Sequence, residues 1–228
     1  MKLELYPPPV YFMHIPKTAG TSFRQFMNLV YRKQRTFEVY SNLQLQNMSE
    51  AEIKNFDCYL CHRGASVYNL VGRDDLPCIT ILRDPVERLI SALYFRQWRV
   101  KQIPHIFVQE WLDLMVPLQD ADLRTLLSTP VLAELERDVQ TQDLGIDSSS
   151  DLRRIMQDGS GGGAGRPHGE DPLERLSLLG QHDMNQAACD ARQRLERMAV
   201  VGVTERYDEF MELVCDLLGV PVPARSPA

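Results

Sequence analysis

A cluster of small polar residues follows an early apolar run and has the composition of an anion site. Residues 10–13 predict a buried strand, and KTAGTS, residues 17–22, predicts a short loop before a helix that carries Phe23 on its apolar face. A helix start presents free backbone N–H groups and the positive end of the helix dipole, which favour phosphate or sulfate. We therefore predict an anion site formed by Lys17, Thr18, Ala19, Gly20, Thr21 and Ser22.

Each residue type in this loop has a distinct use. Backbone amides from Thr18 to Ser22 would wrap the anion, and Gly20 would permit its close approach. Lys17 supplies a positive charge, while the hydroxyl groups supply further donors. The loop is not a Walker A motif, because Lys17 precedes Gly20 instead of following it. The alternative is an ordinary strand-to-helix turn, which requires neither the lysine nor three hydroxyls.

A second motif, ILRDPVERLISA, occupies residues 81–92. Arg83 ends a predicted strand, Asp84 and Pro85 predict a helix start, and Ser91 lies about two helical turns into that helix. An arginine and a serine that converge on one phosphate would form a second anion site. Arg88 is ambiguous, because instead of joining this anion site it could equally be a surface partner of Asp84 or Glu87.

Strands and helices alternate along the chain, which predicts an α/β fold with a central, mainly parallel sheet flanked by helices. We expect core strands at 10–13, 57–61, 78–82 and 199–203, with a short strand or extended connection at 36–40. We expect helices at about 22–33, 85–98, 104–115, 131–140, 184–198 and 205–218, and another that Ser49 caps. Ligands of such sheets bind at the carboxyl ends of the strands. The loops at Lys17, His62 and Arg83 should therefore meet.

The length of 228 residues suits a single domain over residues 1–228. A Gly/Ser-rich stretch at about 147–170 predicts a flexible insertion. Residues 1–101 carry 14 Lys and Arg against 9 Asp and Glu, whereas the remainder carries a net charge of −11. The basic part holds the anion loop, which fits a small polyanionic ligand.

Five cysteines form no even framework, and Cys58, Cys61 and Cys78 are expected to be reduced core thiols. No His/Cys spacing supports a metal site. No apolar run approaches the roughly 20 residues needed to span a bilayer, and prolines interrupt the N-terminal segment. As given, the chain is expected to be soluble and cytoplasmic, or in the Golgi lumen if it was cut from a longer anchored protein.

Together, HIPKTAGTS and ILRDPVERLISA resemble the cofactor-binding pair of sulfotransferases that use 3′-phosphoadenosine 5′-phosphosulfate (PAPS). The resemblance is greatest to the carbohydrate branch related to heparan and uronyl 2-O-sulfotransferases. CHRG at 61–64 is similar to a strand-end Gly-His element, with Cys61 in place of the usual glycine. VGVTERY at 201–207 is similar to a late VGxTE segment. The resemblance implies a P-loop-like sulfotransferase fold.

The resemblance also implies roles for individual residues. Lys17 to Ser22 would hold the 5′-phosphosulfate, and Arg83 with Ser91 would hold the 3′-phosphate. His62 would be the general base that takes the proton of the acceptor hydroxyl, a role that suits a near-neutral pKa. Lys17 would offset charge on the leaving phosphate. The alternative for His62 is a structural hydrogen bond in its loop.

We therefore predict an enzyme that moves a sulfuryl group from PAPS to an acceptor hydroxyl and requires no metal. The acidic second half argues against a polyanionic acceptor, although the strip RQWRVK at 96–101 is basic. We expect the acceptor to be a neutral saccharide or a small-molecule alcohol. We expect no nucleic-acid partner, and the sequence does not predict the oligomeric state. Two alternatives stay open: a non-catalytic nucleotide-binding homologue and a nucleotide kinase. The kinase is the weaker of these because the Lys-Ser/Thr order that brings Mg²⁺ to phosphates is missing.

Overall fold

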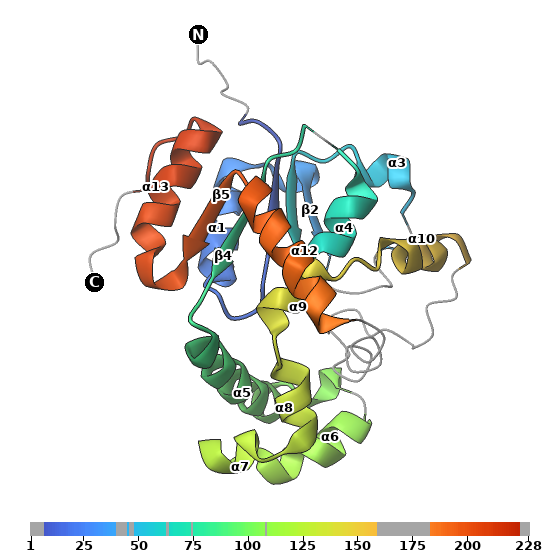
Figure 1. The fold of residues 1–228 in the computed structure, drawn as a ribbon, viewed down its shortest axis with the longest axis vertical. Coiled ribbons are helices and arrows are strands. Elements are labelled where there is room, and N and C mark those ends of the chain that lie inside the picture. The colour runs from blue at the N-terminus through green and yellow to red at the C-terminus, as the bar shows by residue number, and fades with distance from the viewer. Residues whose placement is uncertain are drawn as a thin grey trace.

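Five short strands form one fully parallel sheet in the part of the chain that the computed structural model describes (Figure 1). That part comprises residues 7–39, 45, 48–62, 64–73, 75–107, 109–158 and 183–223. The order across the sheet is β2-β3-β1-β4-β5. The strands are β1 (Val10–Met13), β2 (Thr36–Val39), β3 (Cys58–Cys61), β4 (Cys78–Leu82) and β5 (Val200–Val203). The predicted α/β class with a central parallel sheet is confirmed.

Helices cover both faces of the sheet. Alternate side chains of β1 point to opposite faces, so Phe12 packs with α1 (Gly20–Val30) and α13 (Tyr207–Leu218). Tyr11 packs on the other face, where α4 (Gly64–Val71), α9 (Val139–Gly145) and α12 (Met184–Arg197) lie. The central strands are buried on both sides, which explains their continuous apolar sequences.

A helical extension with its own apolar core follows β4 (Figure 1). It starts with α5 (Pro85–Gln102), the longest described helix, and Leu93 and Trp111 are among its buried residues. The other helices of the extension are α6 (Gln109–Met115), α7 (Leu123–Leu127) and α8 (Pro130–Glu136), with 3₁₀ turns at Pro104–Ile106 and Val116–Leu118. The extension ends with α8, and α9 then packs against the sheet.

Helix starts follow the predicted capping chemistry. Asp84 accepts hydrogen bonds from the backbone of Val86 and Glu87, both at 3.0 Å, and Pro85 is the first residue of α5. Ser49 forms a capping box with Glu52 at α3 (Glu50–Ile53). The sequence therefore places these helix starts correctly.

Several boundaries differ from prediction. Helix α5 continues beyond Trp98 to Gln102, and the helix expected over 131–140 is divided into α8 and α9. The division occurs at Asp138, whose φ of 46° is incompatible with a continuous helix. Helix α10 (Ser149–Asp158) occupies the start of the predicted insertion, and residues 159–182 lie outside the described residues. The flexible insertion and the domain limits stay predictions.

The Cys58-x-x-Cys61 pair lies on β3 and not at a helix start. Cys58 belongs to the core on one face of the sheet and Cys61 to the core on the other, so the two thiols point apart. Burial raises the pKa of the Cys58 thiol well above its usual value. Both are free thiols, as expected. Within the described ranges, no helix is long and apolar enough to cross a membrane.

Candidate functional site

The three predicted loops meet at the carboxyl edge of the sheet. Strand β1 lies between β3 and β4, and Met13 pairs with Cys61 on one side and Thr80 on the other. The residues that follow these strands therefore leave the sheet at nearly the same level. The anion loop follows β1, His62 follows β3 and Arg83 follows β4. This convergence agrees with the expectation from the order of the elements.

The anion loop has an alternating backbone conformation. Lys17 and Ala19 are left-handed, with φ of 71° and 65°, and Thr18 between them has a negative φ. A left-handed conformation in a residue other than glycine costs about 1–3 kcal/mol and is concentrated at functional sites. Such alternation turns successive N–H groups toward one concavity, a nest that suits an anion. Among the described residues no side chain caps α1, so its first N–H groups remain to be satisfied.

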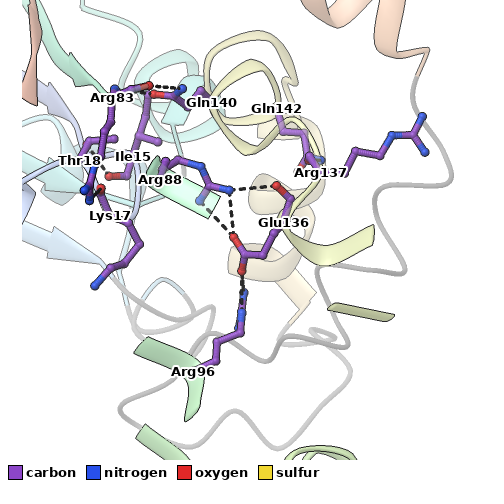
Figure 2. Close-up of polar contacts among 10 residues, drawn as sticks. All are labelled: Ile15, Lys17, Thr18, Arg83, Arg88, Arg96, Glu136, Arg137, Gln140 and Gln142. Atoms are coloured by element: carbon purple, nitrogen blue, oxygen red, sulfur yellow. Dashed lines mark hydrogen bonds and ion pairs between the residues drawn. The ribbon is translucent and has the colours of Figure 1, made fainter. Parts of the chain in front are cut away.

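The hydroxyls of the loop divide into two kinds. Thr18 is fully buried, and its hydroxyl donates to the carbonyl of Ile15 at 2.8 Å (Figure 2). That side chain stabilises the loop, which leaves its backbone N–H as the group for an anion. Thr21 and Ser22 are exposed on the first turn of α1. They are the exposed hydroxyl residues of the loop.

Lys17 lies against α5. Its Nζ is 3.8 Å from the centre of the Phe95 ring, a cation–π contact. Partial burial and the neighbouring Arg83 lower the pKa of Lys17, and Glu136 opposes them. The ammonium group is therefore held beside the loop on an aromatic face. Phe95 is a contact that the sequence reasoning missed.

Gly20 makes room for a histidine. A Cβ on Gly20 would lie 1.8 Å from Nε2 of His14, so any side chain at position 20 would collide with that ring. His14 is 6% exposed and stacks on Phe12, with 5.3 Å between ring centres. The sequence predicted that Gly20 admits an anion; the structure adds that Gly20 admits the imidazole beneath the loop.

The ring of His62 lies on that of His14, with 3.9 Å between their centres and 34° between their planes. Burial lowers the pKa of His14 well below its ordinary value, and the charges of His62 and Arg24 lower it further. His14 is therefore neutral at physiological pH and supports His62 as an uncharged aromatic surface. The sequence did not predict this contact between His14 and His62.

Arg83 connects the second motif to the anion loop. Its guanidinium donates to the carbonyl of Lys17 at 3.4 Å and lies 3.6 Å from the carboxylate of Glu87. Both backbone groups of Arg83 bind the side-chain amide of Gln140, each at 2.9 Å (Figure 2). The side chain of Arg83 is 25% exposed, so it remains accessible to an anion. The structure brings Lys17 and Arg83 together, as the two motifs predicted.

Ser91 lies on the same face of α5 as Phe95. Residues four apart on a helix are neighbours, so the hydroxyl of Ser91 is one turn before the ring that contacts Lys17. Ser91 is half-buried. This spacing could have identified Phe95 from the sequence, whereas no pattern pointed to Gln140.

Arg88 is buried, so its interpretation as a surface partner of Asp84 or Glu87 was wrong. Its guanidinium donates to the carboxylate of Glu136 at 3.1 Å and to the Glu136 carbonyl at 2.9 Å (Figure 2). Arg96 binds the other carboxylate oxygen of Glu136 through Nε at 2.6 Å. Charges this deep are stable only when paired and hydrogen-bonded. The network fixes α5 against the end of α8.

A cavity of about 320 Å³ lies between the start of α5 and the connection from α8 to α9. Its walls include Pro85, Leu89, Val139 and Gln140. Because Gln140 also binds the backbone of Arg83, that arginine lies between the cavity and the anion loop. No group of three His, Cys, Asp or Glu side chains in the described part of the chain could hold a metal ion.

Part of the chain is similar to a known protein family. No curated protein is similar enough in sequence to be matched. Residues 8–114 match the model of the sulfotransferase family, a segment that holds the anion loop, His62, Arg83 and Ser91. The α/β fold with a central parallel sheet agrees with that match. The match covers just under half of the chain, and it shows that this part is similar to sulfotransferases, which supports sulfuryl transfer in general.

Proposed function

We propose that this protein transfers the sulfuryl group of PAPS to a hydroxyl of a saccharide or small-molecule alcohol. The products are a sulfate ester and adenosine 3′,5′-bisphosphate. The observation that carries the proposal is the contact between Arg83 and Lys17, which places two cationic anion-binding motifs side by side. PAPS carries two separate anionic groups, at its 5′ and 3′ positions, so a site with two adjacent cationic positions suits it.

The residues present fit the donor. The alternating backbone of Lys17 and Ala19 and the uncapped start of α1 suit the 5′-phosphosulfate. Arg83 is partly exposed, and Ser91 lies on the face of α5 that turns toward Lys17, which suits the 3′-phosphate. The cationic groups come from the basic first part of the chain. PAPS is therefore the donor that we assign.

The proposed reaction is an in-line transfer. The acceptor oxygen forms a bond to sulfur, while the bond between sulfur and the bridging phosphate oxygen breaks. His62 takes the hydroxyl proton, and the bisphosphate leaves with the bond's electron pair. Lys17 stabilises the negative charge that develops on the departing oxygen. His14 supports this role for His62, because a neutral ring packed at 3.9 Å holds the base in place.

The basic strip at 96–101 does not argue for a polyanionic acceptor. Arg96 binds Glu136, and Lys101 pairs with Asp120. Lys101 is thus neutralised, Arg96 shares Glu136 with Arg88, and the chain as a whole carries a net charge of −6. We therefore place the enzyme near the carbohydrate branch that its motifs resemble, with an uncharged acceptor.

Calorimetric titration tests the donor. Adenosine 3′,5′-bisphosphate is expected to bind tightly, adenosine 5′-monophosphate more weakly, and ATP with Mg²⁺ weakest. Tight binding of ATP with Mg²⁺ alone would instead indicate a nucleotide kinase. Transfer of radiolabelled sulfate from PAPS to an acceptor panel tests the chemistry. Bisphosphate binding without transfer to any acceptor would leave a non-catalytic nucleotide-binding homologue as the correct description.

A further inference from the structure

Three large aromatic side chains are exposed on one face of α5. Tyr94 is 49% exposed, Phe95 38% and Trp98 53%. Spacings of three and four residues place them on the same side of the helix. The Phe95 and Trp98 rings are stacked, with 5.7 Å between their centres and 17° between their planes. We call these three residues the aromatic platform. An exposed apolar patch of this kind marks a binding surface.

The platform adjoins the proposed transfer site. Lys17 Nζ lies 3.8 Å from the centre of the Phe95 ring, and Ser91 precedes Phe95 by one helical turn. Trp98 lies about one turn farther along the same face. A molecule that covers Trp98 and Phe95 would therefore extend to Lys17, the lysine of the proposed transfer site. This position suits an acceptor.

The cations beside the platform are held by partners within the chain. Arg96 is bound by Glu136, and Lys101 is bound by Asp120. The guanidinium of Arg99 lies over the rings of Phe95 and Phe107, at 5.7 Å and 5.1 Å from their centres. Cations used in this way hold the aromatic side chains in place. The acidic remainder of the chain, with a net charge of −11 after residue 101, disfavours a chain of negative charges.

The platform also has polar groups at its edges. The Tyr94 hydroxyl and the Trp98 indole N–H are donors attached to apolar rings. A sugar ring has the matching construction, with C–H groups on its faces and hydroxyls around its rim. A planar aromatic alcohol would use the faces but leave most of the edge donors without partners. The combination therefore favours a saccharide.

We infer that the aromatic platform binds the ring of an uncharged saccharide acceptor, stacked on Phe95 and Trp98 with a hydroxyl directed toward Lys17. The inference rests on the proposed function, because it takes Lys17 as part of the transfer site. It narrows the acceptor from any alcohol to a neutral sugar. It also makes Trp98 a residue that determines acceptor affinity, at a distance from the donor.

Tryptophan fluorescence gives a direct test. The chain has two tryptophans, and Trp111 is only 1% exposed whereas Trp98 is 53% exposed. Ligands that cover the platform should change the emission of Trp98 alone. Protein saturated with adenosine 3′,5′-bisphosphate would be titrated with cellotriose, chitotriose and lactose, with a heparin tetrasaccharide and with 2-naphthol. At least one neutral sugar should change the emission, and the same sugar should accept labelled sulfate from PAPS.

Variants separate the platform from the donor site. Trp98→Ala should raise the KM for the neutral sugar about tenfold in the transfer reaction. Trp98→Phe should keep this KM within about threefold of the parent protein's value. Leu213→Ala, at an equally exposed apolar position on α13, is the matched control and should change nothing. Bisphosphate affinity should be the same in all three variants.

Two results would overturn the inference while leaving the proposed function intact. One is bisphosphate binding with no response of Trp98 to any neutral sugar. The other is a KM for the accepted sugar that Trp98→Ala leaves unchanged. If the parent protein binds no bisphosphate, the proposed function itself fails, and that result is read from calorimetry before any sugar is added.

Discussion

The guanidinium of Arg83 donates a hydrogen bond to the backbone carbonyl of Lys17, across 3.4 Å and 66 residues of sequence. The contact joins the two motifs that bind anions in our proposal. It also adds positive charge beside Lys17, which, after burial, is the second cause of that lysine's lowered pKa. Two cations this close are stabilised by an anion between or beside them.

Arg83→Ala should lower the affinity for adenosine 3′,5′-bisphosphate by roughly 10- to 100-fold, the effect of losing about 1.5–3 kcal/mol of charge-assisted hydrogen bonding. The affinity for adenosine 5′-monophosphate should change little, because that nucleotide lacks the 3′-phosphate. Calorimetry with both nucleotides measures the difference. Arg137→Ala, at an arginine side chain that is 60% exposed, is the control. Equal losses for both nucleotides would remove the 3′-phosphate assignment of Arg83.

His62→Ala should abolish sulfuryl transfer, a loss of about 10²- to 10⁴-fold for a general base, and leave bisphosphate affinity nearly intact. Lys17→Ala should also abolish transfer, because it removes charge stabilisation from the leaving group. Labelled-sulfate transfer and calorimetry measure the two properties. His105→Ala, at an exposed histidine in the helical extension, should retain activity. Retained activity in His62→Ala would exclude His62 as the base.

His14 should make the fold less stable as the pH falls. Burial, His62 and Arg24 lower its pKa well below 6.5 in the folded protein, so the unfolded chain binds the proton more readily. The free energy of unfolding therefore rises with pH, and it decreases as the pH falls from about 7 to 5. Urea denaturation at several pH values measures the slope.

His14→Gln is the variant for that measurement, since it removes the titrating group. Its slope of unfolding free energy against pH should be flatter than that of the parent protein. Its stability at neutral pH should also be lower, because the rings of Phe12 and His62 lose their neighbour. Equal slopes in the two proteins would show that His14 is not a source of the acid sensitivity.

Glu136→Gln should destabilise the fold by about 3–5 kcal/mol, because Arg88 would be left buried without its counter-charge. Glu134→Gln is the matched control on the same helix. Its carboxylate pairs with Arg137 at the surface, where an ion pair contributes about 0–1 kcal/mol. Urea denaturation measures both. Similar effects of the two substitutions would contradict the structural role of the buried network.

The sequence predicted the elements with local signals. Asp84 and Pro85 mark the start of α5, and the apolar run 78–82 marks a buried strand. The sheet class followed from the alternation of such elements, and the meeting of Lys17 with Arg83 followed from the rule that ligands bind at carboxyl ends of parallel strands. These features depend on short-range chemistry, which a single sequence displays.

The features that the sequence did not predict depend on long-range packing. Arg88 appeared to have partners one turn away at most, yet it binds Glu136, which is 48 residues later. Gln140 holds the backbone of Arg83 across 57 residues, and glutamine has no spacing that would reveal this role. The break at Asp138 likewise arises from the path of α8 and α9, because nothing in its local sequence demands a left-handed residue.

Because the ring of His14 fills the space beside Gly20, the residues at these two positions constrain each other. A side chain at position 20 can be accepted only if the ring at position 14 becomes smaller, so the two are expected to change together in related chains. The same coupling extends to His62 through the stacked imidazoles. Diversification of the anion loop is therefore constrained by the histidine that supports the proposed base.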